Sequence, residues 1–267
     1  MAKNLNDTQC EKIWEQITKE IRQYCTKHNF QGVTFGLSGG IDSALIAALS
    51  IDALGPENIH CFMLSTINTA DLSKNLAHEM CQINNLEYKD IDIMEILESS
   101  IATVPKFKNH LTIENLQSRI RGLLIMTYAN DNPWLALCCG NKSEASVGYC
   151  TLYGDTIGGL APIADLYKTE VYALANWRNK KSLIIPEGII TRTPSAELRK
   201  NQTDQDILPP YDILDNVLYQ LIEQNKSPES ITEADKETIT WINNQYHKTA
   251  FKRAQMPPVI KIRHLIN

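Results

Sequence analysis

One short loop holds the residues of this chain that are best suited to chemistry. It consists of Gly36, Leu37, Ser38, Gly39, Gly40, Ile41, Asp42 and Ser43. An apolar run over 32–37 leads into it and predicts a buried strand, and the apolar run over 44–51 that follows predicts a helix. Glycine lets an anion approach backbone N–H groups, and the first turn of a helix leaves N–H groups unpaired at the positive end of its dipole. The sequence therefore predicts an anion cradle, most simply for phosphate.

An ordinary strand-to-helix turn is the alternative for this loop. A Gly-Gly pair alone would favour that alternative, but Ser38 and Ser43 place a hydroxyl at each end of the string and Asp42 places a carboxylate inside it. The string matches neither the GxxxxGK[ST] loop nor the GxGxxG loop. We therefore favour phosphate binding by a loop of another type.

A second polar group follows the apolar residues 134–139, which predict another buried strand. Asn141, Lys142 and Glu144 suit a polar site better than a core. A solvated loop with a helix cap is the alternative, and this group alone does not decide between the two.

Two further segments favour a polar site. Lys168 stands at the start of a helix predicted over 168–178, where the helix dipole disfavours a cation unless an anion lies near. The stretch 192–206 is rich in side chains that form hydrogen bonds.

Strand-like and helix-like segments alternate along the first half of the chain. This alternation predicts an α/β fold with a doubly wound, mostly parallel sheet and helices on both faces. Right-handed crossovers would place loop 36–43 at the carboxyl edge, where such sheets bind ligands. Strands are predicted at 32–37, 58–64, 87–93 and 134–139, helices at 8–27, 69–85, 95–104, 113–130, 168–178, 211–225 and 228–246, and mostly loop at 186–210.

Composition limits the classes of function. The chain has 267 residues, a net charge of −5 and 43% hydrophobic residues, which fits a globular protein without a general attraction to nucleic acid. No apolar run approaches the roughly 18 residues of a membrane helix, and the N-terminus lacks the apolar core of a signal peptide. The 7 cysteines are odd in number and include no CxxC, which argues against disulfides and structural zinc. We expect a cytoplasmic protein that binds neither nucleic acid nor membrane.

Seven motifs, in their order along the chain, resemble those of NAD synthetases, which belong to the N-type ATP pyrophosphatases. They are SGGIDS, ENLQSRIRG, GNKSE, GYCTLYGD, LYKTEVY, RTPSAELRKNQTDQD and PPYDILD. The resemblance covers roughly residues 30–255 and is closer to the synthetase domain of glutamine-dependent enzymes than to ammonia-only enzymes. It implies a Rossmann-like fold and a ligase. In such enzymes ATP adenylates the nicotinate carboxylate of deamido-NAD, pyrophosphate leaves, and ammonia displaces AMP to give NAD.

The resemblance also implies how ATP would be held. Asp42 and Glu144 would supply carboxylates to Mg²⁺, and loop 36–43 would hold the pyrophosphate part of ATP. Asp42 and Lys168 would be catalytic, because attack on the α-phosphate builds charge on phosphoryl oxygens that cations must stabilise.

Further contacts are implied by the same resemblance. Lys168 and Ser195 would contact ATP phosphates, and the surroundings of Cys139 would touch the adenosine. Arg119, Glu144 and Lys252 would bind deamido-NAD, with Arg119 making a charge-assisted bond to a phosphate.

Each of these roles has a simpler alternative. Asp42 would then only cap a helix, and Glu144 would be a surface acid. Arg119 would belong to a solvated helix face, Ser195 would shape a turn, and Lys252 would be one of several solvated lysines.

Two positions depart from the family pattern. Cys139 stands where the family often has threonine, which affects adenine binding only if a side-chain hydroxyl is needed. Phe251 replaces the histidine that precedes the C-terminal lysine in ammonia-only members.

The resemblance implies one synthetase domain over residues 1–267 with no glutaminase domain, because only one predicted helix precedes residue 30. The nitrogen donor would be free ammonia or ammonia from a separate glutaminase, and the family implies a homodimer. The alternatives are amidation of nicotinate mononucleotide, a nucleotide-binding subunit without turnover, and another pyrophosphatase reaction such as tRNA thiolation. The negative charge and the lack of CxxC disfavour tRNA thiolation.

Overall fold

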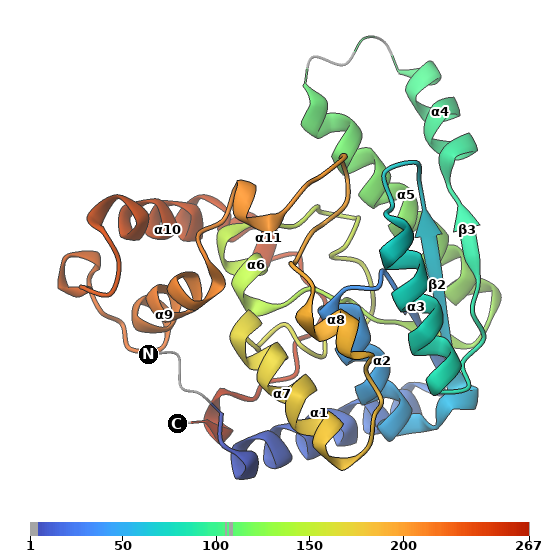
Figure 1. Cartoon of the computed structure of the whole chain (residues 1–267), viewed down its shortest axis with the longest axis horizontal. Coiled ribbons are helices and arrows are strands. Elements are labelled where there is room, and N and C mark those ends of the chain that lie inside the picture. Colours follow the sequence, from blue (N-terminus) through green and yellow to red (C-terminus); the bar gives the residue numbers. More distant parts are fainter. Residues whose placement is uncertain (1–4, 105, 107–108, 267) are drawn as a thin grey trace.

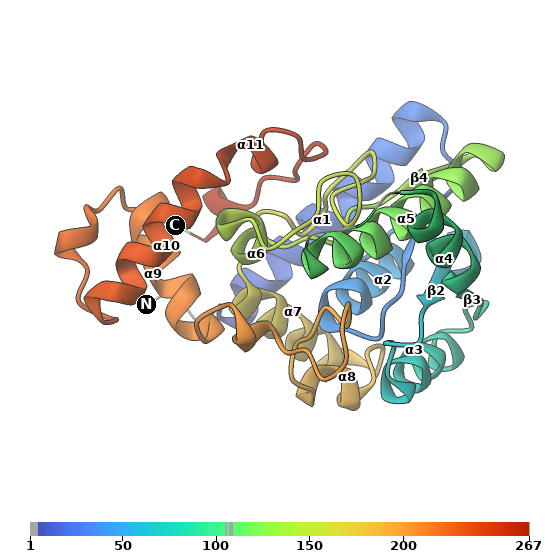
Figure 2. The ribbon, with the colours of Figure 1, turned by 90° about the horizontal axis from the view of Figure 1, so that it is seen from above.

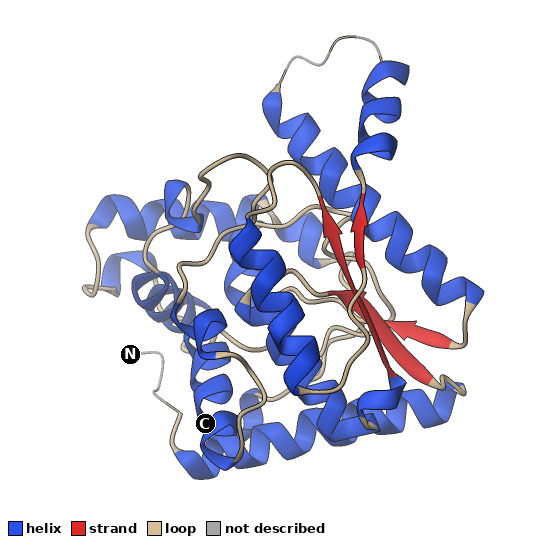
Figure 3. Ribbon diagram, turned by 45° about the vertical axis from the view of Figure 1, so that its right-hand side comes forward, coloured by secondary structure: helices blue, strands red, loops and turns tan. Residues whose placement is uncertain are grey.

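A four-stranded parallel sheet with helices on both faces forms the centre of the protein, as the sequence predicts (Figure 3). The computed structural model describes residues 5–104, 106 and 109–266. The strand order across the sheet is β3-β2-β1-β4. The strands are β1 (Gly32–Gly36), β2 (Ile59–Ser65), β3 (Asp90–Asp92) and β4 (Trp134–Ala136).

The helices surround this sheet (Figure 1). In chain order they are α1 (Asp7–His28), α2 (Ile41–Leu54), α3 (Asp71–Ile83), α4 (Met94–Thr103), α5 (His110–Asp131), α6 (Lys142–Val147), α7 (Lys168–Lys181), α8 (Glu187–Thr191), α9 (Tyr211–Ile222), α10 (Lys236–Lys248) and α11 (Ala250–Arg253). Short 3₁₀ turns are formed by Pro56–Asn58, Asp204–Asp206, Pro228–Ser230 and Arg263–Leu265.

The pairing of the strands places their carboxyl ends together. All three pairings are parallel, and Val33 of β1 lies between Ile59 of β2 and Leu135 of β4. The chain passes from β1 to β2 on one side of β1, whereas the later strand β4 pairs on its other side, so the strand order reverses between β1 and β4. Such a reversal of strand order leaves a crevice at the carboxyl edge of a sheet.

Single bridges continue the sheet beyond β4. Leu137 pairs with Leu160, and Ala161 pairs with Val259, both in parallel. Cys138 N donates to Leu160 O at 2.9 Å, so the backbone on the outer side of this strand is occupied by another part of the chain.

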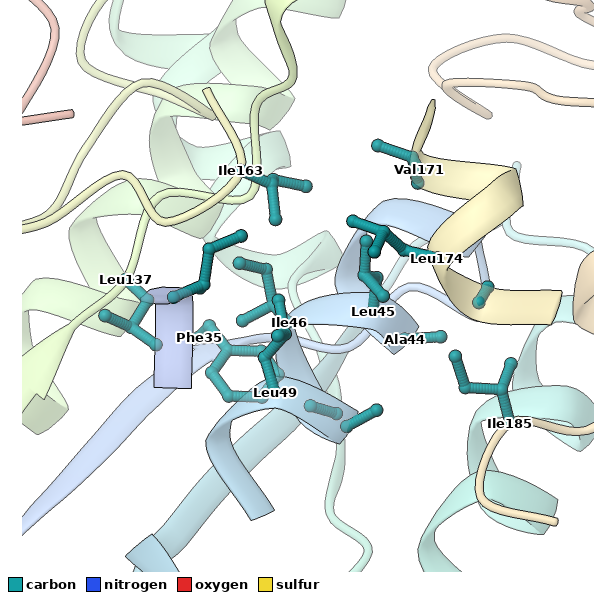
Figure 4. Packing of buried hydrophobic residues seen from close by; sticks show 14 of the residues in the cluster. Phe35, Ala44, Leu45, Ile46, Leu49, Leu137, Ile163, Val171, Leu174 and Ile185 are labelled. Atoms are coloured by element: carbon teal, nitrogen blue, oxygen red, sulfur yellow. The ribbon is translucent and has the colours of Figure 1, made fainter. Parts of the chain in front are cut away.

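One face of the sheet is covered by α1, α2, α3 and α7. Residues 44–49 of α2 are all fully buried, as expected for a helix that is apolar on every side. Phe35 of β1 packs with Ile46 and Leu49 of this helix and with Leu137 (Figure 4). The helix that follows the phosphate loop is therefore fixed in the centre of the largest core.

The other face is covered by α4 and α5. Phe62 and Leu64 of β2 share a core with Ile120 and Ile125 of α5. A third core joins α6, α9 and α10, with Val147 among its buried residues. In both views α9 and α10 lie to one side of the sheet, so they form a wall beside its carboxyl edge (Figure 1 and Figure 2).

Most predicted elements are confirmed, but the last predicted helix begins later than expected. Within 228–246, the stretch Pro228–Ser230 forms only a 3₁₀ turn, and α10 begins at Lys236. The reason is the cap, since Asp235 Oδ1 accepts a hydrogen bond from Thr238 N at 2.9 Å. The short helix α6 was not predicted, and α8 lies inside the stretch predicted to be mostly loop.

In the part of the chain that the structure describes, every helix is too short or too polar to cross a membrane.

Candidate active site

A cavity of about 660 Å³ lies at the carboxyl edge of the sheet. Its lining includes Gly36 and Leu37 at the end of β1, Leu64 near the end of β2, and Cys139 after β4. Its walls come from α5, from the stretch 147–155, from the loop around 192–204 and from α10. The crevice expected from the strand order is therefore present and large enough for a nucleotide.

The predicted phosphate loop opens into this cavity. Every residue of 36–43 except Gly39 contributes to the lining. Ser43 Oγ accepts a hydrogen bond from Ser38 N at 3.2 Å and donates one to Gly40 O at 3.1 Å, which closes the loop on itself. The first bond of α2 runs from Ala44 N to Gly40 O, so the N–H groups of the first turn remain available to an anion.

Lys168 lies between two carboxylates at the edge of this loop. Its Nζ donates to Asp42 Oδ2 at 2.5 Å and to Glu144 Oε1 at 2.9 Å. Asn141 Nδ2 donates to Asp42 Oδ1 at 2.9 Å, which fixes the second oxygen. The anions that the dipole argument demanded near Lys168 are thus Asp42 and Glu144.

The surroundings shift the pKa values of Lys168 and Glu144 by different balances of burial and charge. Burial disfavours the charge of Lys168, but Asp42 and Glu144 outweigh burial and raise the pKa of its ammonium group. Burial raises the pKa of Glu144 to about 7, and Lys168 opposes that rise while Asp42 and Asp204 add to it. Lys168 is therefore a permanent cation, while Glu144 is held near its point of ionisation.

Tyr211 connects Glu144 to a third carboxylate, Asp204, which a second tyrosine also contacts. Tyr211 OH lies 3.2 Å from Glu144 Oε1 and 2.7 Å from Asp204 Oδ2. Tyr149 OH donates to Asp204 Oδ1 at 3.3 Å. Burial raises the pKa of Asp204 as well, against the effect of Lys168. The cavity therefore contains more carboxylate than lysine at this point.

A buried carboxylate aligns the helices that carry these groups. Asp215 of α9 accepts from Ser143 Oγ and from Thr169 N, the latter at 2.8 Å. Lys168 N also donates to Ser143 Oγ at 2.8 Å. Burial raises the pKa of Asp215 to about 6. Through these contacts α9 fixes the start of α6 and the start of α7 side by side.

Two other predicted residues line the cavity but are already bonded. Ser195 Oγ donates to Gln202 O at 2.5 Å. Lys252 Nζ donates to Gly148 O at 2.8 Å and to Cys150 O at 2.6 Å. A ligand would therefore share or replace these contacts.

Cys139 lines the cavity directly after β4, as predicted. Burial raises the pKa of its thiol well above the ordinary value, so the side chain is a neutral thiol at neutral pH. A neutral thiol offers only a weak hydrogen bond where threonine would offer a hydroxyl.

Arg119 lies apart from the other predicted residues. It is exposed, its Nε donates to Leu152 O at 3.1 Å, and it is absent from the lining of the cavity as far as the described residues define it. Arg121, two positions further on, lines the cavity and donates its Nε to Leu64 O at 2.8 Å. Burial lowers the pKa of Arg121 to about 10, which leaves it charged at neutral pH.

Sequence reasoning missed four residues of the site. Arg121 was considered only as part of a solvated face, and Asp204 and Arg192 only as parts of a polar stretch. Tyr211 was assigned to the start of a helix without a role. The pair Pro209-Pro210 before Tyr211 was the available signal, because it starts a helix abruptly and leaves that tyrosine at the first position.

The carboxylates fit a magnesium ion that is shared with phosphates. Asp42 and Glu144 both line the cavity beside the phosphate loop. Among the described residues, no three His, Cys, Asp or Glu side chains are arranged to hold a metal by themselves. Mg²⁺ is commonly held by one or two carboxylates, with substrate phosphates and water as the remaining ligands, and this donor set suits that arrangement.

A family model and the curated relatives of this chain agree with each other. The family model described as NAD synthase matches residues 13–257. A glutamine-dependent NAD(+) synthetase of Xanthomonas campestris is 44% identical over 257 residues, which are 93% of this chain and 47% of the relative. A glutamine-dependent NAD(+) synthetase of Synechocystis is 42% identical over 94% of this chain and 46% of the relative. The chain thus spans about half the length of the curated relatives it matches.

Two solved structures of similar fold have about the length of this chain, whereas a glutamine-dependent NAD+ synthetase from Acinetobacter baumannii is covered over only 45% of its length. An NH3-dependent NAD synthetase from Campylobacter jejuni has a TM-score of 0.77 at 30% identity, with 94% of this chain and 99% of that chain covered. An NMN synthetase from Francisella tularensis has a TM-score of 0.80 at 25% identity, with 91% of this chain and 95% of that chain covered.

Proposed function

Because the chain belongs to the NAD synthase family, we propose that it is an ATP-dependent ligase that amidates deamido-NAD to NAD. One observation carries the proposal. Lys168 is held between Asp42 and Glu144 directly beside a loop of glycine and serine at the start of a helix. This places a cation, metal-type ligands and backbone N–H donors around one point, as transfer of a nucleotidyl group requires.

The reaction has two steps. A carboxylate oxygen of the nicotinate ring attacks the α-phosphorus of ATP, the bond between the α-phosphorus and the bridging oxygen breaks, and pyrophosphate leaves. The nitrogen of ammonia then attacks the carbonyl carbon of the adenylate, AMP leaves, and the surplus proton passes to solvent. The first step accumulates negative charge, which Lys168 stabilises together with the N–H groups of loop 36–43.

Magnesium is the ion that this site would hold when ATP binds. Asp42 and Glu144 are its protein ligands in our proposal, and the ion would neutralise phosphate charge. Asn141 keeps one oxygen of Asp42 oriented, and Tyr211 does the same for Glu144.

Other residues of the cavity would hold the two nucleotides. We propose that Ser195 and Lys168 contact ATP phosphates and that the Cys139 region contacts the adenosine. Lys252 and Glu144 would bind deamido-NAD. Arg121 takes the place of Arg119 as the arginine for an anionic ligand, because it is half-buried and lines the cavity.

Two matched variants test this choice of arginine. Arg121→Gln should raise the KM for one of the two nucleotides about tenfold, because a charge-assisted bond is lost. Arg119→Gln should change neither KM by more than about twofold, because an exposed charge contributes little. Steady-state kinetics with each substrate varied in turn would measure both. The reverse ranking would return the role to Arg119.

Ammonia is the nitrogen donor in our proposal. The similar NH3-dependent synthetase is covered over 99% of its length, which supports a reaction without glutaminase residues. The curated relatives are glutamine-dependent enzymes of about twice this length, so ammonia supplied by a separate glutaminase is an equal candidate. A homodimer, expected from the family, would be tested by sedimentation velocity.

Amidation of nicotinate mononucleotide is the second candidate function. Its support is the NMN synthetase with a TM-score of 0.80. The large cavity, which extends as far as Trp241 of α10, favours the longer dinucleotide.

One assay separates these possibilities. The purified protein is incubated with ATP, Mg²⁺ and ammonium, with either deamido-NAD or nicotinate mononucleotide, and the amide product and AMP are quantified. We expect NAD and AMP in equal amounts from deamido-NAD. Glutamine in place of ammonium should give no product. Absence of AMP with both substrates would refute the proposed ligase.

A further inference from the structure

Within the predicted phosphate loop, the peptide between Gly39 and Gly40 is held by one long hydrogen bond, from Gly40 N to Ser38 Oγ at 3.3 Å. Gly39 and Gly40 follow each other, and a peptide between two glycines turns over more easily than any other. In a trans peptide the carbonyl and the N–H point in opposite directions. If the 39–40 peptide turned over, a carbonyl oxygen would face the cavity, where it would repel a phosphate.

Gly39 itself is held on the side of the loop away from the cavity. Its φ of +74° lies in the left-handed region, and a Cβ at this position would meet Ser73 O at 2.3 Å. The contact with α3 is thus backbone against backbone. It sets the position of the loop but does not by itself select the orientation of the next peptide.

Arg192 selects that orientation. Its Nη1 donates to Gly39 O at 3.2 Å and to Ser73 Oγ at 2.9 Å. With the carbonyl directed to Arg192, the N–H of Gly40 points the other way and donates a long hydrogen bond to Ser38 Oγ at 3.3 Å, which an anion would share or replace. Ser38 and Gly40 both line the cavity, so this N–H is on the side where an anion would lie.

Glu197 holds Arg192 in place. Arg192 Nη2 donates to Glu197 Oε1 at 2.8 Å, and Ser73 Oγ donates to the same oxygen at 2.5 Å. Ala70 N at the start of α3 donates to Glu197 Oε2 at 3.3 Å. The side chains of Arg192 and Glu197 are only 14% and 18% exposed, so the pair is largely shielded from water.

The backbone conformation of Glu197 is a second sign that its contact with Arg192 serves a function. Its φ of +50° is unfavourable for a residue with a side chain. Such strain persists only where the surroundings enforce it, and it is common at functional sites. Here the carboxylate must reach both α3 and Arg192, and the strained backbone gives it that reach.

We infer that Arg192, held by Glu197, is a positioning residue that keeps the N–H of Gly40 directed at the pyrophosphate part of ATP. The inference rests on the proposed function, because it takes ATP as the ligand of loop 36–43. It adds a role for the 192–204 stretch, which connects a distant part of the chain to the loop. Arg192 acts through the loop backbone and through charge-assisted bonds that only its forked side chain can make.

Calorimetric titration with three ligands tests this inference. The proteins are wild type, Arg192→Gln, Arg192→Lys, Glu197→Gln and the control Arg199→Gln, whose side chain is 49% exposed and pairs with Asp206. The ligands are ATP with Mg²⁺, inorganic pyrophosphate with Mg²⁺, and AMP. We expect Arg192→Gln to weaken ATP and pyrophosphate about tenfold or more, with AMP unchanged within about twofold. Arg192→Lys and Glu197→Gln should lie between this variant and wild type, and Arg199→Gln should match wild type.

Kinetics add a readout that a loss of structure would not give. The KM for ATP should rise in Arg192→Gln while the KM for deamido-NAD stays within about threefold of wild type. Equal affinity of Arg192→Gln and wild type for ATP would overturn the inference, as would an equal loss for ATP and AMP. If Arg192→Gln does not fold, Arg192→Lys takes its place, and its loss of affinity for ATP is compared with its loss of affinity for AMP. Failure of the wild type to bind ATP would instead refute the proposed function.

Discussion

Lys168 and Lys142 are the centres of two charge groups with the same composition, in which a lysine contacts two carboxylates and a tyrosine ring. Each ammonium group binds two carboxylates, Asp42 and Glu144 for Lys168, and Asp165 and Glu223 for Lys142. Each lies over the ring of a tyrosine, at 5.1 Å from the centroid of Tyr211 for Lys168 and 5.2 Å from that of Tyr167 for Lys142. The hydroxyl of each tyrosine reaches a carboxylate of its group, Glu144 or Glu223.

The surroundings of the two groups differ. Asp165 also accepts hydrogen bonds from Ile262 N at 2.9 Å and from Arg263 N at 3.3 Å. Arg263 adds a second cation, since its Nε lies 4.0 Å from Asp165 Oδ1. The Lys168 group has no second cation in contact among the described residues, and a further carboxylate, Asp204, lies behind Tyr211.

The pKa values of the carboxylates reflect this difference. Burial would raise the pKa of Asp165, but Lys142, the backbone N–H of Ile262 and Arg263 together lower it. Burial raises the pKa of Glu144 to about 7, and Lys168 does not offset it. Asp165 accepts several hydrogen bonds from a cation and from backbone N–H groups, which stabilise its charge. Glu144 has fewer donors and lies near other acids, so a further cation would stabilise its charge. We therefore interpret the Lys142 group as structural and the Lys168 group as ready to accept Mg²⁺ with ATP.

Replacing each lysine should have the largest and most unequal effects. Lys168→Gln should lower kcat/KM about 1,000-fold, because a cation next to the transferred phosphate is lost. Lys142→Gln should leave kcat/KM within about fivefold at a temperature where it is folded, yet lower the free energy of unfolding by about 3 kcal/mol, because buried carboxylates lose their partner. Kinetics and urea denaturation measure the two quantities. Similar activity losses in both variants would refute the division into a structural and a functional group.

The pH dependence of stability should distinguish Glu144 from Asp165. The pKa of Glu144 is raised from 4.5 to about 7, so the folded state binds its proton more tightly, and this group lowers stability as pH rises from about 4.5 to 7. The pKa of Asp165 is lowered, so its contribution is present above about 4 and is lost as pH falls through its folded pKa.

The corresponding variants should therefore respond oppositely to pH. Relative to wild type, Glu144→Gln should gain stability as pH rises from about 4.5 to 7, and Asp165→Asn should show a deficit at pH 7 that shrinks below about pH 4. Urea denaturation without nucleotide or Mg²⁺, repeated across that range, gives both curves. Parallel curves for the two variants would mean that the two carboxylates have similar surroundings.

The smallest effects are expected from the tyrosines. Tyr211→Phe and Tyr167→Phe each remove one hydroxyl and should each cost about 1 kcal/mol of stability. Tyr211→Phe should in addition raise the Mg²⁺ concentration needed for half-maximal activity about threefold, because Glu144 loses an orienting contact. Tyr167→Phe is the matched control and should leave that concentration unchanged. A shift of equal size in both variants would contradict the comparison.

Much of this arrangement could be predicted from local sequence. The phosphate loop, the parallel sheet and the need for an anion near Lys168 follow from glycine, alternation and the helix dipole, which act over a few residues. The pairing of Asp42 with Lys168 came only from the structure, because 126 positions separate the two residues.

Contacts between distant segments were beyond such reasoning. The role of Arg192 depends on α3, on the phosphate loop and on the strained backbone of Glu197, and no periodicity announces any of them. Arg121 and Arg119 look alike in sequence, and only the packing of α5 decides which one lines the cavity. The start of α10 was misplaced because Pro228 is a common helix start, but Asp235 provides the better cap.

The margins of the sheet have a consequence for how the protein behaves at high concentration. An uncovered outer strand is a template on which another chain can add, and this leads to aggregation. Here the bridges from Leu137 to Leu160 and from Ala161 to Val259 occupy one margin. The opposite margin is β3, which has only three residues and carries Asp90 and Asp92. Neither side offers a long neutral strand, so recruitment of further chains through the sheet is disfavoured.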